Sequence, residues 1–105
     1  MLVASLLLSR GFNVFSAVAP SGSPVDLVVE DPKTHQRTYV QVKTAQQVRG
    51  HLLARPRAGH YQSRAVDLLA VVGPAHQVWV FPMALVGSKK TLYVHLPEAD
   101  GWRLS

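Results

Sequence analysis

Three residues near the middle of the chain have side chains that could bind a metal ion and activate water. Asp26, Gln41 and Lys43 provide a carboxylate, an amide oxygen and an ammonium group. Mg²⁺ prefers oxygen ligands and keeps several of its waters, so Asp26, Gln41 and the backbone carbonyl of Val42 could hold it. Lys43 could activate the attacking water or stabilise charge on a phosphate. This set of groups favours phosphodiester hydrolysis with Mg²⁺ or Mn²⁺ as cofactor.

Two predicted strands joined by a polar turn must position these residues. Residues 24–45 read PVDLVVEDPKTHQRTYVQVKTA, in which apolar and polar residues alternate on both sides of a segment rich in turn-forming types. A strand has a side-chain period of two, so Gln41 and Lys43 should point to the same face. A hairpin register that brings Asp26 beside them would gather all three groups at the sheet surface.

The rest of the chain predicts one α/β domain, over residues 1–105, with a central mixed sheet of about five strands flanked by helices. Residues 46–66 are predicted as a loop with one short helical turn after Gln46, because Gly50, Pro56 and Gly59 break any long helix. The other expected elements are a short helix at 2–10, strands at 12–19, 65–72, 76–82 and 91–96, a helical turn at 83–86, and a polar tail at 97–105 anchored by Trp102.

The charge of the chain favours an anionic partner, with nucleic acid first. The formal net charge is +5, and no acidic residue occurs between Lys43 and Val66. Arginine forks match phosphate oxygens and an aromatic ring can stack on a base. The alternative is a solvated basic loop without a specific partner. The residues expected to contact DNA are Arg49, Arg55, Arg57, His60, Tyr61 and Arg64.

Composition excludes several other classes of protein. The chain has no cysteine, which excludes disulfides and thiolate metal sites. No apolar run approaches the roughly 20 residues of a membrane span, and a reducing cytoplasm fits this composition. The five histidines have no pairwise spacing typical of a zinc site, so we interpret them as surface or core residues. Trp79, Phe81 and Tyr93 are expected in the core.

The run from Pro24-Val25-Asp26 through the hairpin to QVKTA at residues 41–45 resembles the PD-(D/E)XK nuclease superfamily. The similarity is greatest to the intron-encoded endonucleases, in which Gln replaces the second acid, and the archaeal Holliday-junction resolvases are similar in layout. The later segments YQSRAVDLLAVV and VWVFP resemble the downstream part of that branch. The resemblance implies a restriction-endonuclease-like core, with Asp26 and Gln41 as metal ligands and Lys43 as the catalytic lysine.

The resemblance also leaves alternatives open. Many members of the superfamily carry a metal-binding Glu on the first helix, whereas this chain has no acid before Asp26. Aligning the helices puts that Glu just upstream of Met1. The chain is then a truncated form, a member that dispenses with this ligand, or an inactive relative that binds nucleic acid. The size of the domain and the resemblance together predict a homodimer that acts on DNA.

Simpler interpretations of the same residues exist. Asp26 could accept backbone N–H groups from the adjacent turn, and Asp67 could approach the site from the start of a strand. Gln41 and Lys43 could line a solvent-facing strand edge. A third hypothesis is an interaction protein whose basic surface contacts an acidic protein.

Overall fold

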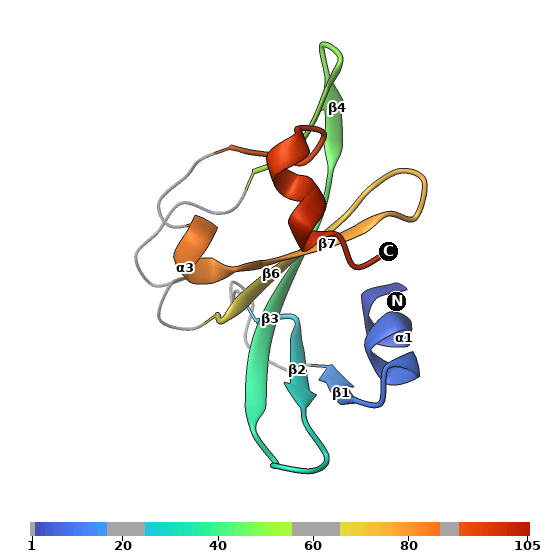
Figure 1. Ribbon diagram of the computed structural model, residues 1–105, viewed down its shortest axis with the longest axis vertical. Coiled ribbons are helices and arrows are strands. Elements are labelled where there is room, and N and C mark those ends of the chain that lie inside the picture. Colours follow the sequence, from blue (N-terminus) through green and yellow to red (C-terminus); the bar gives the residue numbers. More distant parts are fainter. Residues whose placement is uncertain (1, 17–24, 56–65, 87–90) are drawn as a thin grey trace.

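The computed structural model describes residues 2–16, 25–55, 66–86 and 91–105, and its described part contains two sheets (Figure 1). A five-stranded sheet has the order β1-β2-β3-β6-β7, and a three-stranded sheet has the order β4-β5-β8. The β3–β6 pair is parallel and the other pairs are antiparallel, so the predicted α/β class with a mixed five-stranded sheet is confirmed. The elements are α1 (Leu2–Ser9), β1 (Asn13–Ser16), β2 (Leu27–Glu30), β3 (Arg37–Thr44), β4 (Gln46–Val48), β5 (His51–Ala54), β6 (Leu68–Val72), β7 (Val78–Pro82), α3 (Met83–Val86), β8 (Leu92–Tyr93) and the 3₁₀ helix η1 (Pro97–Trp102).

The central strand β3 connects the two sheets. It pairs with β2 on one side as the predicted hairpin and with β6 on the other. After Ala45 the chain continues directly into β4, so that β3 and β4 follow one long path through the molecule (Figure 1). The N–H of Ala45 donates to the carbonyl of Val72 at 2.8 Å, which holds this junction against the end of β6.

One face of the five-stranded sheet is covered by α1. The helix is apolar on nearly all sides, and Val3 is completely buried against the sheet. Alternate residues of the strands meet it, as the period of two requires. The buried residues of this layer are Val3, Leu27, Val29, Val40, Ala70 and Val78.

The opposite face is covered by α3, β8 and η1. Leu69 and Val71 of β6 point to this face, whereas Ala70 points to the α1 face. Burial on both faces explains why β6 reads as a nearly continuous apolar run. Trp79 and Phe81 of β7 are buried here as expected.

Residues 56–65 of the loop predicted after Gln46 lie outside the described residues, and the prediction is wrong for residues 46–54. The segment instead forms an antiparallel hairpin in which Val48 pairs with His51. Its two turn residues, Arg49 and Gly50, have φ angles of 50° and 81°. Two consecutive positive φ values match the twist of a two-residue hairpin loop, so Gly50 here joins two strands and does not end a helix.

The C-terminal segment, predicted as a polar tail, contains regular structure. Residues 97–102 form η1, and the last strand is limited to Leu92 and Tyr93. Trp102 is 40% exposed, with its ring centroid 6.4 Å from that of Phe81. Beyond it, the N–H of Leu104 donates to the carbonyl of Val78 at 2.7 Å, so the tail is attached to β7. Tyr93 is 44% exposed, which corrects its expected place in the core.

Replacement of Leu69 by Ala should test the core on the α3 side. Leu69 is 0% exposed, so truncation removes buried methyl groups and leaves a cavity. We expect the free energy of unfolding to fall by about 2–5 kcal/mol, measured by urea denaturation. Leu8→Ala is the control, because Leu8 is 55% exposed and should change stability by less than about 0.5 kcal/mol. Equal losses in the two variants would contradict this packing.

Candidate active site

Strand β3 places Gln41 and Lys43 on one face of the sheet. The parallel register pairs Gln41 with Leu69 and Lys43 with Val71, both of which point toward the side covered by α3 and η1. Gln41 is 4% exposed, and Lys43 is half-buried. The interpretation of Gln41 as a solvent-facing strand residue is therefore wrong, because its side chain is buried on a strand that pairs with β6.

Asp26 lies beside Gln41, as the predicted hairpin register requires. It directly precedes β2, and its N–H donates to the carbonyl of Val40 at 2.9 Å. Its Oδ2 accepts a hydrogen bond from the N–H of Val42 at 2.7 Å. The two bonds go to the residues on either side of Gln41 in β3, one from the backbone N–H of Asp26 and one to its carboxylate, so Asp26 is held against the strand beside Gln41. The turn at residues 20–24, an alternative source of N–H donors, lies outside the described residues.

The side chain of Gln41 carries an unused acceptor. Its Oε1 is buried and has no hydrogen-bond partner within the described part of the chain. A buried amide oxygen without a donor costs about 1–3 kcal/mol, and most buried polar atoms in folded proteins are paired. A divalent cation is a partner that would satisfy this oxygen. The residues present therefore fit Mg²⁺, which takes carboxylate and amide oxygens.

The backbone carbonyl of Val42 is the third oxygen proposed as a metal ligand. The N–H and C=O groups of one strand residue project to the same side of the strand. The Val42 carbonyl is therefore directed toward the edge where its N–H bonds Asp26. Carboxylate, amide and backbone carbonyl thus come from three residues on two neighbouring segments.

Asp67 lies on the other side of β3 and is engaged by the backbone. Its Oδ2 accepts from the N–H of Tyr39 at 2.9 Å, and its own N–H donates to the carbonyl of Tyr39 at 2.9 Å. Its carbonyl accepts from the N–H of Met83. These bonds fix the start of β6 beside β3, which is a structural role that the sequence left open. Across the described ranges, no three His, Asp or Glu side chains gather into a metal cluster.

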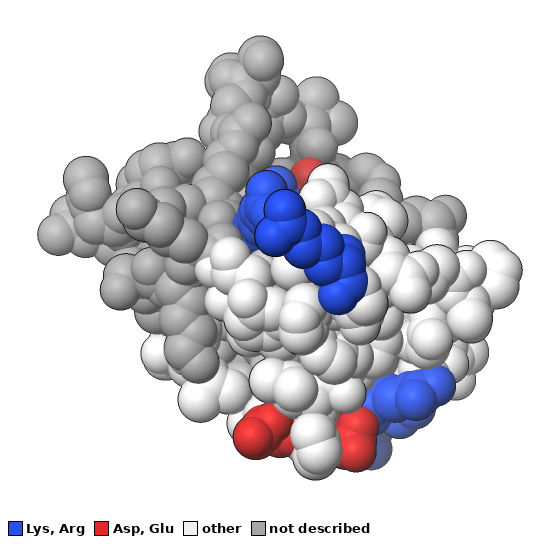
Figure 2. All heavy atoms as spheres, turned by 90° about the horizontal axis from the view of Figure 1, so that it is seen from above, with Lys and Arg blue, Asp and Glu red and all other residues white. Residues whose placement is uncertain are grey.

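The basic residues expected to contact DNA are only partly described. Arg49 occupies the β4–β5 turn and Arg55 follows β5, and both are exposed. On the face shown in Figure 2, charged side chains form small separate groups and uncharged side chains cover most of the described surface. The remaining expected contacts lie outside the described residues: Arg57, His60, Tyr61 and Arg64.

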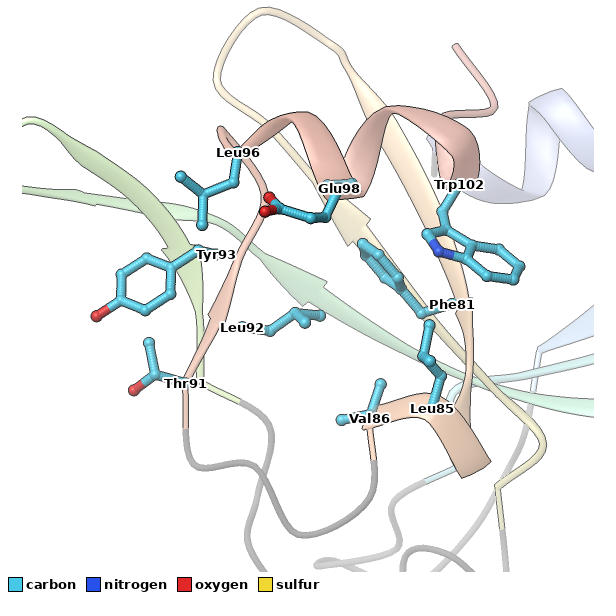
Figure 3. Close-up of a pocket in the computed structure, with 10 residues that line it drawn as sticks. Phe81, Leu85, Val86, Thr91, Leu92, Tyr93, Leu96, Glu98 and Trp102 are labelled. Atoms are coloured by element: carbon cyan, nitrogen blue, oxygen red, sulfur yellow. The ribbon is translucent and has the colours of Figure 1, made fainter.

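A hollow on the α3 side of the molecule is lined by none of Asp26, Gln41 and Lys43. It has a volume of about 480 Å³ and opens between α3, β8 and η1 (Figure 3). Its lining is mainly apolar, with Glu98 as the one carboxylate among the described residues that form it. A single exposed carboxylate among apolar groups provides no acid–base pair, so we place the candidate site at Asp26, Gln41 and Lys43.

Comparison with known proteins identifies the fold. No family model and no curated protein sequence matches the chain. Among solved structures, the bacterial homing endonuclease I-Ssp6803I is similar, with a TM-score of 0.76 over 98% of this chain and 79% of that chain. The chain therefore has the same fold as this endonuclease. The two sequences are 18% identical, so this likeness extends to the fold and not to individual site residues.

Replacement of Gln41 by Met should stabilise the protein in the absence of divalent cations. The change keeps a similar volume and removes the unpaired buried oxygen, so we expect the free energy of unfolding to rise by about 1 kcal/mol. Urea denaturation in the presence of EDTA measures this change. Gln47→Met, at an exposed position of β4, should alter stability by less than about 0.5 kcal/mol. A destabilised Gln41→Met protein would contradict the assignment of an unpaired oxygen.

Proposed function

We propose that this chain is a metal-dependent DNA endonuclease that hydrolyses phosphodiester bonds at Asp26, Gln41 and Lys43. The observation that carries the proposal is the buried, unpaired Oε1 of Gln41 beside the carboxylate of Asp26. Support also comes from the fold, which is shared with a homing endonuclease. The spacing of the three residues resembles the metal-binding motif of the PD-(D/E)XK superfamily, with Gln41 in place of the second acid.

Each side chain has a distinct role in the proposed reaction. The Asp26 carboxylate, the Gln41 amide oxygen and the Val42 carbonyl would hold Mg²⁺ or Mn²⁺. When bound, such a cation supplies Lewis-acid stabilisation of charge on the phosphate. Lys43 can donate hydrogen bonds to a phosphate oxygen or to the attacking water, and its position one strand period from Gln41 puts it on the same face.

The surroundings of these groups restrict their motion before substrate arrives. The N–H of Val42 holds one oxygen of Asp26 at 2.7 Å, and the side chain of Gln41 is buried. Catalytic groups that are already positioned need little reorganisation during the reaction. The polar atoms of this site are thus held by the most central strand of the fold.

DNA is the proposed partner, and Arg49 and Arg55 are the described residues proposed to contact its phosphates. Arg49 lies in the turn of the β4–β5 hairpin, and Arg55 directly follows β5. One domain of this size covers little DNA, and one site cuts one strand. We therefore propose a homodimer in which each subunit cuts one strand, which sedimentation of the protein with and without duplex DNA can test.

Replacement of Lys43 by Ala should abolish cleavage and leave binding intact. We expect the wild type to cut supercoiled plasmid or a four-way junction with Mg²⁺ or Mn²⁺, and Lys43→Ala to lower the rate by about 100-fold or more. Gel assays of nicked and linear products measure this, and a filter-binding assay checks DNA affinity. Lys33→Ala is the matched control, because Lys33 is an exposed lysine in the β2–β3 turn. Equal cleavage by wild type and Lys43→Ala would refute the role of Lys43.

Arg49→Ala and Arg55→Ala should weaken DNA binding in a salt-dependent manner. Each lost phosphate contact should lower the slope of log K against log salt concentration by about 1, because fewer counterions are released. Arg37→Ala is the control, since Arg37 lies at the other end of β3 and its Nε is 3.4 Å from Oε2 of Glu30. An unchanged slope in both hairpin variants would show that this end of the molecule does not contact DNA.

A second candidate function is a nucleic-acid-binding module without catalysis. It is favoured by helix α1, whose residues include no acid, and by the lack of any described cluster of three His, Asp or Glu side chains. Salt-dependent DNA binding without cleavage by the wild type, under either metal, would support this module. An absence of DNA binding at low salt would instead favour an interaction with an acidic protein.

A further inference from the structure

Two histidines that are far apart in the sequence meet on the outer surface of the smaller sheet. His51 begins β5, and His95 follows β8. The β5–β8 register pairs Leu53 with Tyr93, so two steps along the same ladder put His51 opposite His95 on one face. Nδ1 of His51 lies 3.2 Å from Nε2 of His95, and the ring centroids are 5.0 Å apart.

The other ring nitrogen of His95 is held by the backbone. Its Nδ1 lies 3.1 Å from the carbonyl oxygen and 3.2 Å from the nitrogen of Leu52. In the tautomer that donates Nδ1–H to the Leu52 carbonyl, Nε2 has a free lone pair directed toward His51. Metal-binding histidines usually donate their second ring N–H to a carbonyl or carboxylate in this way.

The ring of Tyr93 keeps the two imidazoles in place. It contacts His51 at 5.7 Å and His95 at 5.9 Å between ring centroids, with steep interplanar angles of 69° and 80°. Edge-on contacts of this kind restrict rotation of the rings. The pair is therefore positioned by β5 and by the segment that follows β8.

We propose that His51 and His95 form a binding site for a borderline divalent cation such as Zn²⁺, Cu²⁺ or Ni²⁺. Two nitrogens each about 2.05 Å from a tetrahedral Zn²⁺ lie about 3.3 Å apart, which matches the 3.2 Å between Nδ1 and Nε2. When His51 carries its proton on Nε2, both facing nitrogens present lone pairs, so the cation enters by a tautomer shift without release of a proton.

The proposed site differs in chemistry from the site at Asp26. Imidazole suits Zn²⁺, Cu²⁺ and Ni²⁺, whereas Mg²⁺ prefers oxygen ligands. Both histidines are exposed, and no third His, Asp or Glu joins them among the residues described, so water completes the coordination. A cation there would link β5 to the segment after β8, and the proposal is independent of any nuclease activity.

Calorimetric titration of the untagged protein with Zn²⁺, in an excess of Mg²⁺, tests the proposal. We expect one Zn²⁺ per chain at this site, with affinity about tenfold or more lower in His51→Ala and in His95→Ala. His35→Asn and His76→Asn are matched controls, because both histidines are exposed turn residues with positive φ, which Asn tolerates. They should bind as the wild type does.

The two ligand variants separate binding from folding. His95→Ala also removes the bonds to Leu52, whereas His51→Ala leaves these bonds in place. Thermal unfolding in EDTA shows whether each variant is folded. Wild-type affinity in His51→Ala and His95→Ala, or no Zn²⁺ binding by the wild type, would overturn the proposal.

Discussion

The unpaired amide oxygen of Gln41, buried on the central strand, is the constraint on which this account of the molecule depends. Gln41 is 4% exposed on this strand, which β2 holds along residues 37–40 and β6 holds along residues 40–44. Leu69, the β6 partner of Gln41, belongs to the apolar cluster on the same face of the sheet. Oε1 of Gln41 has no hydrogen-bond donor among the described residues. An apolar side chain at this position would therefore make the folded protein more stable. Such local costs are typical of functional sites.

Two aspartates hold this strand from opposite sides. Asp26 accepts from Val42 on the β2 side, and Asp67 accepts from Tyr39 on the β6 side. Both satisfy backbone N–H groups at points where a neighbouring strand begins, yet their surroundings differ. Asp26 lies beside the unpaired oxygen of Gln41, whereas the bonds of Asp67 link β6, β3 and the start of α3. The same residue type thus serves the candidate site in one place and the sheet in the other.

Local patterns were enough to predict the β2–β3 hairpin and most of the central sheet. Alternation over residues 25–44 predicts both strands and the common face of Gln41 and Lys43, because these features depend only on neighbours in the sequence. The burial of Gln41 could not be predicted in this way, since it depends on parallel pairing with β6. The β4–β5 hairpin was missed because Arg49, a residue that rarely adopts positive φ, occupies its turn. His51 and His95 are 44 residues apart, and only the pairing of β5 with β8 brings them together.

Diffraction from crystals soaked in Mn²⁺, recorded with its anomalous signal, tests the central claim most directly. The account predicts an anomalous peak between the carboxylate of Asp26, Oε1 of Gln41 and the carbonyl of Val42, and no such peak in crystals of Gln41→Met. It would be contradicted by wild-type crystals without density at this position, in which Oε1 of Gln41 accepts a hydrogen bond from a protein donor.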